Sequence, residues 1–357
     1  MNFSDYNELT INGHHLKDNE IVEFCKASDI ENIKKLGIFI EDWLSSEATI
    51  SVQTSGSTGT PKIITVQKQQ MLQSAMATAN FFNFKKGQTA LLCLPVNYIA
   101  GKMMVVRALY SRLNLVCIEP NNTPLKNLPK DIQIDFAPLT PMQLKDTKDS
   151  SFVKTILLGG SPVSLEMESN FQKLSSEIYH GYGMTETLSH VALRKINGKD
   201  KSTIYQTLKG IKFSLDSRGC LRIEVPFLKE IIVTNDIVEL ISEQQFIWKG
   251  RADNVINSGG IKLFPEIIEQ KIAPFIAEQY FVSGLPDTLL GEKLCLFIEG
   301  RHYTSDKLQI LKNNLEENLE KYERPKEIIF IPEFKMTESG KIQRKGTIYL
   351  NESKKGT

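Results

Sequence analysis

Hydrophobic and polar residues follow two different periods along the first half of the chain. Short apolar runs that predict β-strands lie at residues 89–94, 113–118, 152–158 and 177–180. Apolar residues at helical spacing predict α-helices at residues 68–82, 103–110 and 164–174. Strands and helices that alternate in this way are typical of an α/β layer with largely parallel strands.

The pattern changes from about Tyr205 onward. Short apolar runs separated by turn residues predict strands at 219–225, 230–234, 237–240 and 245–248. A series of this kind predicts a small antiparallel β-barrel or distorted sheet over about residues 205–250.

A third pattern follows the sequence Gly-Arg-Ala-Asp at 250–253. Helices are predicted at 265–276 and 305–319, and strands at 280–284, 293–299 and 327–331. Together they form a compact α+β module of about a hundred residues, which is a typical domain size. We therefore predict a multi-domain α/β protein with a large N-terminal domain (1–252) and a small C-terminal domain (253–357).

The composition is that of an ordinary globular protein, with 41% hydrophobic and 24% charged residues among 357. A net charge of +1, from 43 basic and 42 acidic residues, gives no electrostatic footprint for nucleic acid or an anionic membrane. The apolar runs are too short to span a membrane, and the polar N-terminal residues do not resemble a signal peptide. The five cysteines lack the CxxC spacing of a zinc site, so we predict that they are buried free thiols. Free thiols are typical of a reducing compartment, which predicts a cytoplasmic protein.

The segment 54–62 concentrates hydroxyls, glycines and one lysine between an apolar run (48–52) and the predicted helix at 68–82. Glycines let several backbone N–H groups approach one anion, hydroxyls donate to phosphate oxygens, and Lys62 adds a positive charge. A strand–loop–helix context would also direct a helix N-terminus at the anion. The segment is not a P-loop, because Pro61 occupies the position of that motif's second glycine. It predicts a cradle for nucleotide phosphates, and a flexible Ser/Gly/Thr linker is the alternative.

Two glycine-containing turns follow predicted strands, at the edge where open α/β sheets bind ligands. In the turn at 180–187, Tyr182 offers a flat face to a purine and Thr185 can hydrogen-bond phosphate. Glu186 in the same turn is a hard oxygen ligand suited to Mg²⁺. In the turn at 158–162, glycines permit a planar ligand to approach the backbone closely. Each turn, taken alone, also fits an ordinary turn without a ligand.

Polar residues after the predicted barrel add candidate ligands for ribose and phosphate. Asp236 can accept hydrogen bonds from both ribose hydroxyls, and Arg251 can donate to ribose or phosphate. Gly259 and Gly260 can form a narrow backbone passage, and Lys341 lies in a turn near the C-terminus. Strand-end turns and a surface lysine are the alternatives.

The order and spacing of these motifs resemble one family, the adenylate-forming acyl-CoA ligases. TSGSTGTPK resembles the family's phosphate loop, YGMTE its adenine and magnesium motif, and TND its ribose motif, with Asn235 in place of the usual Gly. GRADNVINSGGIKLFPEIIE resembles the hinge region, and SGKI resembles the loop that carries the mobile catalytic lysine. The match covers about residues 48–345. It implies the adenylate-forming fold, Mg²⁺ as cofactor, ATP and CoA as co-substrates, and a C-terminal domain that rotates about Asp253.

The resemblance implies a role for each matched residue. Lys341, Glu186 and Thr58 would be catalytic, and Glu186 and Thr58 would hold the metal. ATP would be bound by Thr54, Ser55, Gly56, Ser57, Thr58, Gly59, Thr60, Lys62, Gly160, Ser161, Tyr182, Gly183, Thr185, Asp236 and Arg251. The acyl substrate would contact Tyr98, Arg107, Gly181 and Met184, and the CoA arm would pass Gly259, Gly260 and Lys262.

Within the family, residues 94–101 with Arg107, and residues 135–144, resemble the o-succinylbenzoate–CoA ligases of menaquinone biosynthesis. Arg107 is a cation in an apolar run, and a buried arginine needs an anion such as the second carboxylate of that substrate. An internal salt bridge or a surface position is the alternative for Arg107. The chain departs from the family in two ways: Tyr98 replaces a usual histidine, and only 53 residues precede the phosphate loop. The second departure suggests that part of the N-terminal subdomain is absent.

Other interpretations stay open. The chain could be a ligase for another aryl or fatty acid, a ligase that loads a carrier protein, or a non-catalytic nucleotide-binding relative. Amino-acid-activating relatives place an Asp in the acyl pocket, and neither 95–101 nor 136–144 contains one. A non-catalytic relative is expected to lack Lys341 or Glu186, and both are present. Small molecules are the expected partners, and a homodimer is left open.

Overall fold

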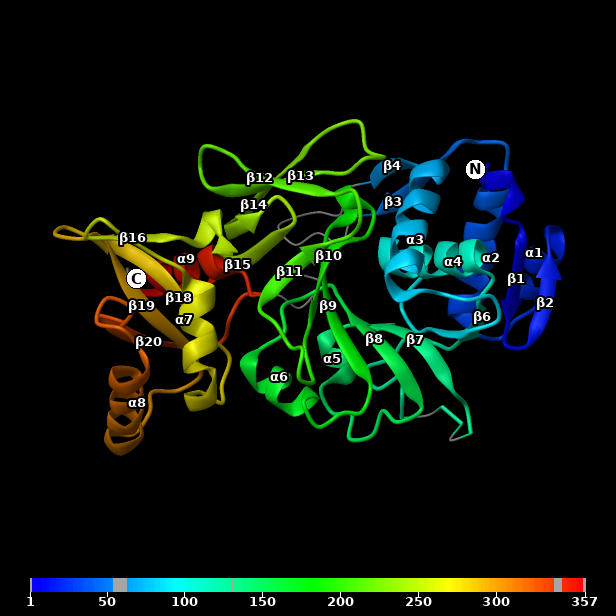
Figure 1. Ribbon diagram of the computed structural model, residues 1–357. Helices are drawn as coiled ribbons and strands as arrows, with labels where there is room; N and C mark the ends of the chain where they lie inside the picture. The colour runs from blue at the N-terminus through cyan, green and yellow to red at the C-terminus, as the bar shows by residue number, and fades with distance from the viewer. Residues whose placement is uncertain (1, 54–62, 127, 130, 337–341, 356–357) are drawn as a thin grey trace.

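The computed structural model describes residues 2–53, 63–126, 128–129, 131–336 and 342–355 (Figure 1). It contains a sheet of 13 strands in the order β12-β13-β14-β15-β11-β10-β9-β8-β7-β5-β6-β1-β2. From β9 to β1 neighbouring strands pair in parallel, and from β9 to β12 they pair antiparallel. The prediction of a parallel α/β layer followed by antiparallel strands is confirmed, and the antiparallel strands continue the same sheet.

The strands of this sheet are short, apart from one in the antiparallel part. The parallel part consists of β1 (Glu8–Ile11), β5 (Thr89–Leu92), β6 (Asn114–Cys117), β7 (Ile134–Leu139), β8 (Val153–Leu158) and β9 (Glu177–Gly183), with β2 (His14–Lys17) at its edge. The antiparallel part consists of β10 (His190–Lys195), β11 (Ile204–Thr207), β12 (Lys212–Leu215), β13 (Cys220–Glu224), β14 (Ile232–Ser242) and β15 (Gln245–Arg251).

Helices cover both faces of the parallel part because its strands are apolar on both sides. One face packs against α1 (Asn19–Lys26), α2 (Glu31–Leu44), α3 (Lys68–Phe82) and α4 (Ile99–Ser111). The other face packs against α5 (Pro141–Leu144) and α6 (Leu165–Phe171). Along β5, Ala90 and Leu92 enter the first core and Leu91 enters the second, as the two-residue period of a strand requires.

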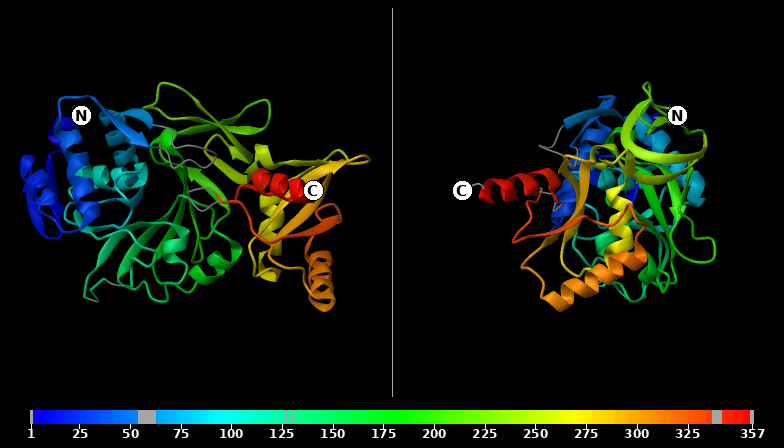
Figure 2. Two further views of the ribbon diagram at one scale, coloured as in Figure 1. Left: turned by 180° about the vertical axis from the view of Figure 1, so that it is seen from behind. Right: turned by 90° about the vertical axis from the view of Figure 1, so that its left-hand side faces the viewer.

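The C-terminal module has a sheet of its own, built from β16 (Ile256–Ser258), β17 (Ile261–Leu263), β18 (Tyr280–Asp287), β19 (Gly291–Glu299) and β20 (Glu327–Ile331). Its helices are α7 (Pro265–Ile272), α8 (Ser305–Asn318) and α9 (Arg344–Lys355). Helices α7 and α8 cover one face of this sheet. The module lies beside β15 in the antiparallel part of the large sheet, far from β1 and β2 (Figures 1 and 2), and α7 contacts β15.

Two local expectations were wrong. The segment 54–62 does not connect a strand to a helix, because β3 (Thr49–Gln53) pairs antiparallel with β4 (Ile63–Gln67) on its far side. The predicted strands at 230–234 and 237–240 overlap one continuous strand of 11 residues, β14 (Ile232–Ser242). The polar pair Asn235-Asp236, which suggested a turn, lies inside that strand next to an irregularity in its pairing with β15. Sequence reasoning also gave no elements before residue 48, where β1, β2, α1 and α2 form.

All five cysteines are free and buried, as predicted. Burial raises the pKa of Cys25 and Cys93 to about 12 and that of Cys295 to about 11, and it also raises the pKa of Cys117 and Cys220. Among the described residues, no helix is long and apolar enough to cross a membrane.

Candidate active site

The predicted phosphate loop (54–62) and Lys341 lie outside the described residues, so the structure places only the segments that flank them. The two residues that flank the predicted phosphate loop are neighbours, because Gln53 pairs with Ile63 across the β3–β4 hairpin. Tyr98 forms a parallel bridge with Gln53 and is 38% exposed. The residue predicted to line the acyl pocket therefore adjoins the start of the predicted phosphate loop.

The predicted adenine motif lies on β9, which continues through Tyr182 to Gly183. Close packing requires glycine at 183, because a Cβ there would lie 2.3 Å from the carbonyl oxygen of Ser189. The side chain of Thr187 stabilises the turn that follows. Its hydroxyl accepts a hydrogen bond from Met184 N (2.9 Å) and lies 2.7 Å from the carbonyl oxygen of Ser189. The motif is thus a strand end followed by a braced turn.

Glu186 lies in this turn on a short 3₁₀ helix, η2 (Thr185–Thr187). Its side chain is exposed and has no hydrogen-bond or ion-pair partner among the described residues. These residues also contain no cluster of three or more His, Cys, Asp or Glu that could hold a metal. A single free carboxylate fits Mg²⁺, which keeps most of its water ligands and takes others from substrate phosphates.

Asp236 joins three strands through its carboxylate. Tyr182 donates its hydroxyl to Asp236 Oδ2 (2.6 Å), and Trp248 donates Nε1–H to Oδ1 (3.2 Å). Arg251, opposite Asp236 in the β14–β15 pair, lies 3.6 Å from Oδ1. Burial, and then the charge of Asp236, raises the pKa of Tyr182 well above its usual value, so the phenol stays protonated as a donor. Three predicted nucleotide ligands, Tyr182, Asp236 and Arg251, therefore form one group.

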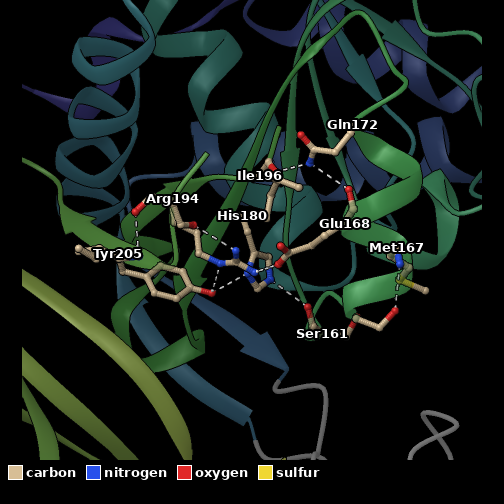
Figure 3. Close-up of polar contacts among 11 residues, drawn as sticks. Ser161, Met167, Glu168, Gln172, His180, Arg194, Ile196 and Tyr205 are labelled. Atoms are coloured by element: carbon tan, nitrogen blue, oxygen red, sulfur yellow. Dashed lines mark hydrogen bonds and ion pairs between the residues drawn. The ribbon is translucent and has the colours of Figure 1, made fainter. Parts of the chain in front are cut away.

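The turn at 158–162 after β8, which was predicted to admit a planar ligand and is called the base loop below, is held by His180, a residue that sequence reasoning did not single out. Gly160 has a positive φ of 84°, which favours glycine, and Ser161 follows it. The carbonyl oxygen of Ser161 lies 3.0 Å from His180 Nε2, and His180 Nδ1 lies 2.7 Å from the Tyr205 hydroxyl (Figure 3). His180 stands two positions before Tyr182 on β9, so the base loop and the predicted adenine motif share a buried polar contact.

Arg107 lies on α4 and is only 2% exposed. Its Nε donates to Thr78 Oγ1 (3.3 Å) and one Nη donates to Ser189 Oγ. His190 completes the cluster, with its ring nitrogens 3.2 Å from the same two hydroxyls. Burial lowers the pKa of Arg107 to about 10, and no carboxylate among the described residues pairs with it. A Cβ at Gly181 would lie 3.0 Å from His190 Cβ, so this cluster adjoins β9.

In the C-terminal module, Gly259 and Gly260 form the two-residue turn between β16 and β17, with φ values of 58° and 82°. Positive φ at both positions is the requirement of a tight hairpin, so local geometry accounts for both glycines. Lys262 is exposed on β17. The assigned CoA passage remains a prediction.

The segment that carries Lys341 is anchored at both ends. Met336 and Ile342 form an antiparallel bridge across it. Arg344, at the start of α9, pairs with Glu269 on α7 (2.8 Å) and donates to the carbonyl oxygen of Val282 (3.0 Å). Burial raises the pKa of Glu269 to about 7, although Arg344 opposes the shift.

The chain matches two family models. The model described as AMP-binding enzyme matches residues 23–212, and the model described as AMP-binding enzyme C-terminal domain matches residues 273–341. The first match spans more than half of the chain. The chain therefore belongs to the AMP-binding enzyme family, the adenylate-forming enzymes that its motifs resemble.

Individual relatives give a narrower comparison. The chain is 36% identical to an acyl-CoA synthetase (AMP-forming)/AMP-acid ligase II-like protein from Dyadobacter fermentans, over 92% of this chain and 97% of that one, with a TM-score of 0.60. It is 28% identical to the 2-succinylbenzoate–CoA ligase of Haemophilus influenzae, over 91% of this chain and 75% of that ligase. The O-succinylbenzoate coenzyme A synthetase of Bacillus subtilis, in complex with ATP and magnesium ion, has a TM-score of 0.71 at 18% identity and covers 87% of this chain and 74% of its own. That last likeness supports the fold.

Proposed function

We propose that the protein is an ATP-dependent 2-succinylbenzoate (o-succinylbenzoate)–CoA ligase of menaquinone biosynthesis, acting in the cytoplasm. It would join the substrate carboxylate to AMP and then transfer the acyl group to CoA, with o-succinylbenzoyl-CoA, AMP and pyrophosphate as products. The names of the Haemophilus influenzae relative and of a second ligase, 25% identical over 95% of this chain, from Lactococcus lactis support this substrate.

The observation that carries the proposal is the buried Arg107. A guanidinium that is 2% exposed and held by two hydroxyls, without a carboxylate among the described residues, is a site for an anion. o-Succinylbenzoate carries two carboxylates. One reacts with ATP, and the other requires a cationic partner, a role that we assign to Arg107, with Gly181 and Met184 as further predicted contacts of the acyl group.

The first half-reaction needs positioning and charge stabilisation rather than covalent help from the protein. In our proposal the loop 54–62, with Thr58 and Lys62, holds the β- and γ-phosphates. The substrate carboxylate attacks the α-phosphorus, the bond to the β-phosphate oxygen breaks, and pyrophosphate leaves. Lys341 contacts the attacking carboxylate and the α-phosphate. Mg²⁺, held by Glu186 and Thr58, would supply positive charge to the polyphosphate.

The nucleoside would bind to the group around Asp236. The carboxylate would accept the ribose hydroxyls, Arg251 would donate to ribose or phosphate, and the Tyr182 ring would face the base. Because Tyr182, Trp248 and Arg251 already orient this carboxylate, ribose meets a fixed acceptor.

In the second half-reaction the CoA thiol attacks the acyl carbonyl and AMP leaves. We propose a domain boundary at Asp253, between the last strand of the large sheet and the first strand of the C-terminal sheet. Rotation of residues 253–357 about this point would withdraw Lys341 and bring Gly259, Gly260 and Lys262 to the CoA arm.

A panel assay tests the proposal. The purified protein is given ATP, Mg²⁺ and CoA with o-succinylbenzoate, benzoate, succinate, a fatty acid or an amino acid, and acyl-CoA is measured by mass spectrometry. We expect o-succinylbenzoyl-CoA as the main product, with AMP and pyrophosphate in equal amounts. A higher kcat/KM for a monocarboxylate would overturn the substrate assignment, and adenylate formation without transfer to CoA would point to a carrier-protein acceptor.

A further inference from the structure

The contacts of His180 fix which of its ring nitrogens carries the proton. The carbonyl oxygen of Ser161 can only accept, so His180 Nε2, 3.0 Å away, must donate. In a neutral imidazole the other nitrogen then accepts, so the Tyr205 hydroxyl donates to Nδ1 over 2.7 Å. Burial, and then the charge of Arg194, lowers the pKa of His180 to about 4, which keeps the ring neutral at physiological pH.

The chain of hydrogen bonds continues past Tyr205. The Tyr205 oxygen accepts from Arg194 Nε (3.2 Å), and the other end of the Arg194 guanidinium pairs with Glu168 on α6. Gln172, one turn further along the chain, donates to the carbonyl oxygen of Ile196 (2.8 Å). Figure 3 shows this directional path from the base loop through β9, β11 and β10 to α6.

Both ends of this path belong to one stretch of chain. Ser161 lies in the loop after β8, and Glu168 lies in α6, which starts directly after the same loop at Leu165. The backbone of the base loop is therefore held at two places: at Ser161 by His180, and at α6 by the ion pair between Glu168 and Arg194. Since Gly160 and Ser161 are predicted nucleotide ligands, the path sets the position of one wall of the predicted base site.

Tyr205 also contacts Tyr182, the residue that forms the second wall of the predicted base site. Its ring meets the ring of Tyr182 edge to face, with centroids 5.9 Å apart, and stacks on Phe246 at 5.1 Å. Tyr182 is the residue predicted to face the purine. One side chain thus has its hydroxyl on the path to Ser161 and its ring against Tyr182, so it couples the two walls.

We propose that His180 and Tyr205 are positioning residues for the nucleotide base, which hold the Ser161 backbone and the Tyr182 ring in fixed positions relative to each other. The proposal rests on the proposed function in so far as this site binds AMP and ATP. It does not depend on which carboxylate the enzyme activates.

Tyr205→Phe is the sharpest test because it removes one hydroxyl and keeps the ring stacked on Phe246. His180 Nδ1 then loses its donor, Arg194 Nε loses its acceptor, and Ser161 is no longer fixed by a single tautomer. We expect AMP affinity, measured by isothermal titration calorimetry, to fall about tenfold, which corresponds to about 1.4 kcal/mol. KM for ATP should rise by a similar factor while KM for the carboxylate stays unchanged.

Tyr179→Phe is the matched control. Tyr179 is on the same strand, with its ring against Phe81 and Phe82, and its hydroxyl makes no hydrogen bond with the described residues. This variant should bind AMP as the wild type does. His180→Ala should behave like Tyr205→Phe, whereas His180→Gln should recover most of the AMP affinity because its amide N–H can reach Ser161.

Two results would overturn the inference. One is folded Tyr205→Phe and His180→Ala proteins that bind AMP like Tyr179→Phe. The other is an equal rise in KM for ATP and for the carboxylate, which would indicate a general structural role. A wild-type protein that binds AMP but does not use o-succinylbenzoate would overturn only the substrate assignment, whereas a wild-type protein that binds neither AMP nor ATP would overturn both.

Discussion

Replacing Arg107 with methionine should change folding stability little and weaken substrate binding strongly. Methionine keeps a similar length and removes the charge. Burial lowers the pKa of Arg107 from 12.5 to about 10, and this difference corresponds to about 3 kcal/mol of unfavourable charge burial. The hydrogen bonds to Thr78 and Ser189 have a charged donor and offset this cost, at about 1.5 to 3 kcal/mol each. We therefore expect the free energy of unfolding to stay constant or to fall by up to about 3 kcal/mol.

Substrate binding should weaken markedly in the same variant. A hydrogen bond between a charged donor and a carboxylate contributes about 1.5 to 3 kcal/mol, which corresponds to roughly a 10- to 150-fold rise in KM for o-succinylbenzoate. KM for ATP should stay within about twofold, because the hydrogen bonds of Arg107 go to Thr78 and Ser189, which are not among the predicted nucleotide ligands.

Urea unfolding and steady-state kinetics measure the two quantities on one protein preparation. Arg112→Met is a suitable control, since Arg112 is exposed at the end of the same helix. The reasoning is refuted if the KM of Arg107→Met for o-succinylbenzoate is unchanged, whether or not the variant loses stability. That outcome would make the Arg107 cluster a structural element of the core.

Three further predictions concern the chemistry, the β9 turn and pH. Lys341→Ala should abolish adenylate formation but leave transfer from supplied acyl-adenylate to CoA largely intact, and an equal loss in both single-turnover assays would contradict its role. Gly183→Ala should destabilise the fold by about 1 to 3 kcal/mol, since its Cβ would lie 2.3 Å from a backbone oxygen, whereas Gly159→Ala, with open space around it, should change thermal unfolding little. The pKa of His180 is lowered to about 4, so the folded protein binds fewer protons than the unfolded chain between about pH 6.5 and 4. Stability should therefore fall as pH decreases through this range, by up to about 3 kcal/mol from this group, and urea titrations at pH 7.5 and 5 should show a smaller fall in His180→Gln.

The features that could be predicted from the sequence are those that depend on residues close together in the chain, such as helix periodicity and short motifs. The helix at 68–82 has the predicted bounds, because its apolar residues recur at helical spacing and β4 ends directly before it. The apolar run around Arg107 left both a buried and a surface position open, and the structure shows that Arg107 is buried. Motif order led to the correct family because several short motifs agreed on one fold.

The features that were not predictable depend on strand pairing. Asp236 suggested a turn because Asn and Asp are turn formers, but pairing with β15 keeps β14 extended through it. The strand β4 was missed because an apolar pentapeptide before a helix gives no sign of its partner β3. His180 and Tyr205 lie 25 residues apart in the sequence. Their side chains come into contact because β9 and β11 flank the same strand, β10, in the sheet.

The five buried cysteines have a practical consequence for measuring domain motion. Their raised pKa values leave almost no thiolate at neutral pH, and thiolate is the form that thiol-reactive dyes attack. One new cysteine in each domain, at Ile38 (61% exposed) and at Leu289 (92% exposed), could therefore be labelled while the native thiols stay in place. Single-molecule fluorescence energy transfer between these two dyes would then record the orientation of the domains as ATP, carboxylate and CoA are added in turn.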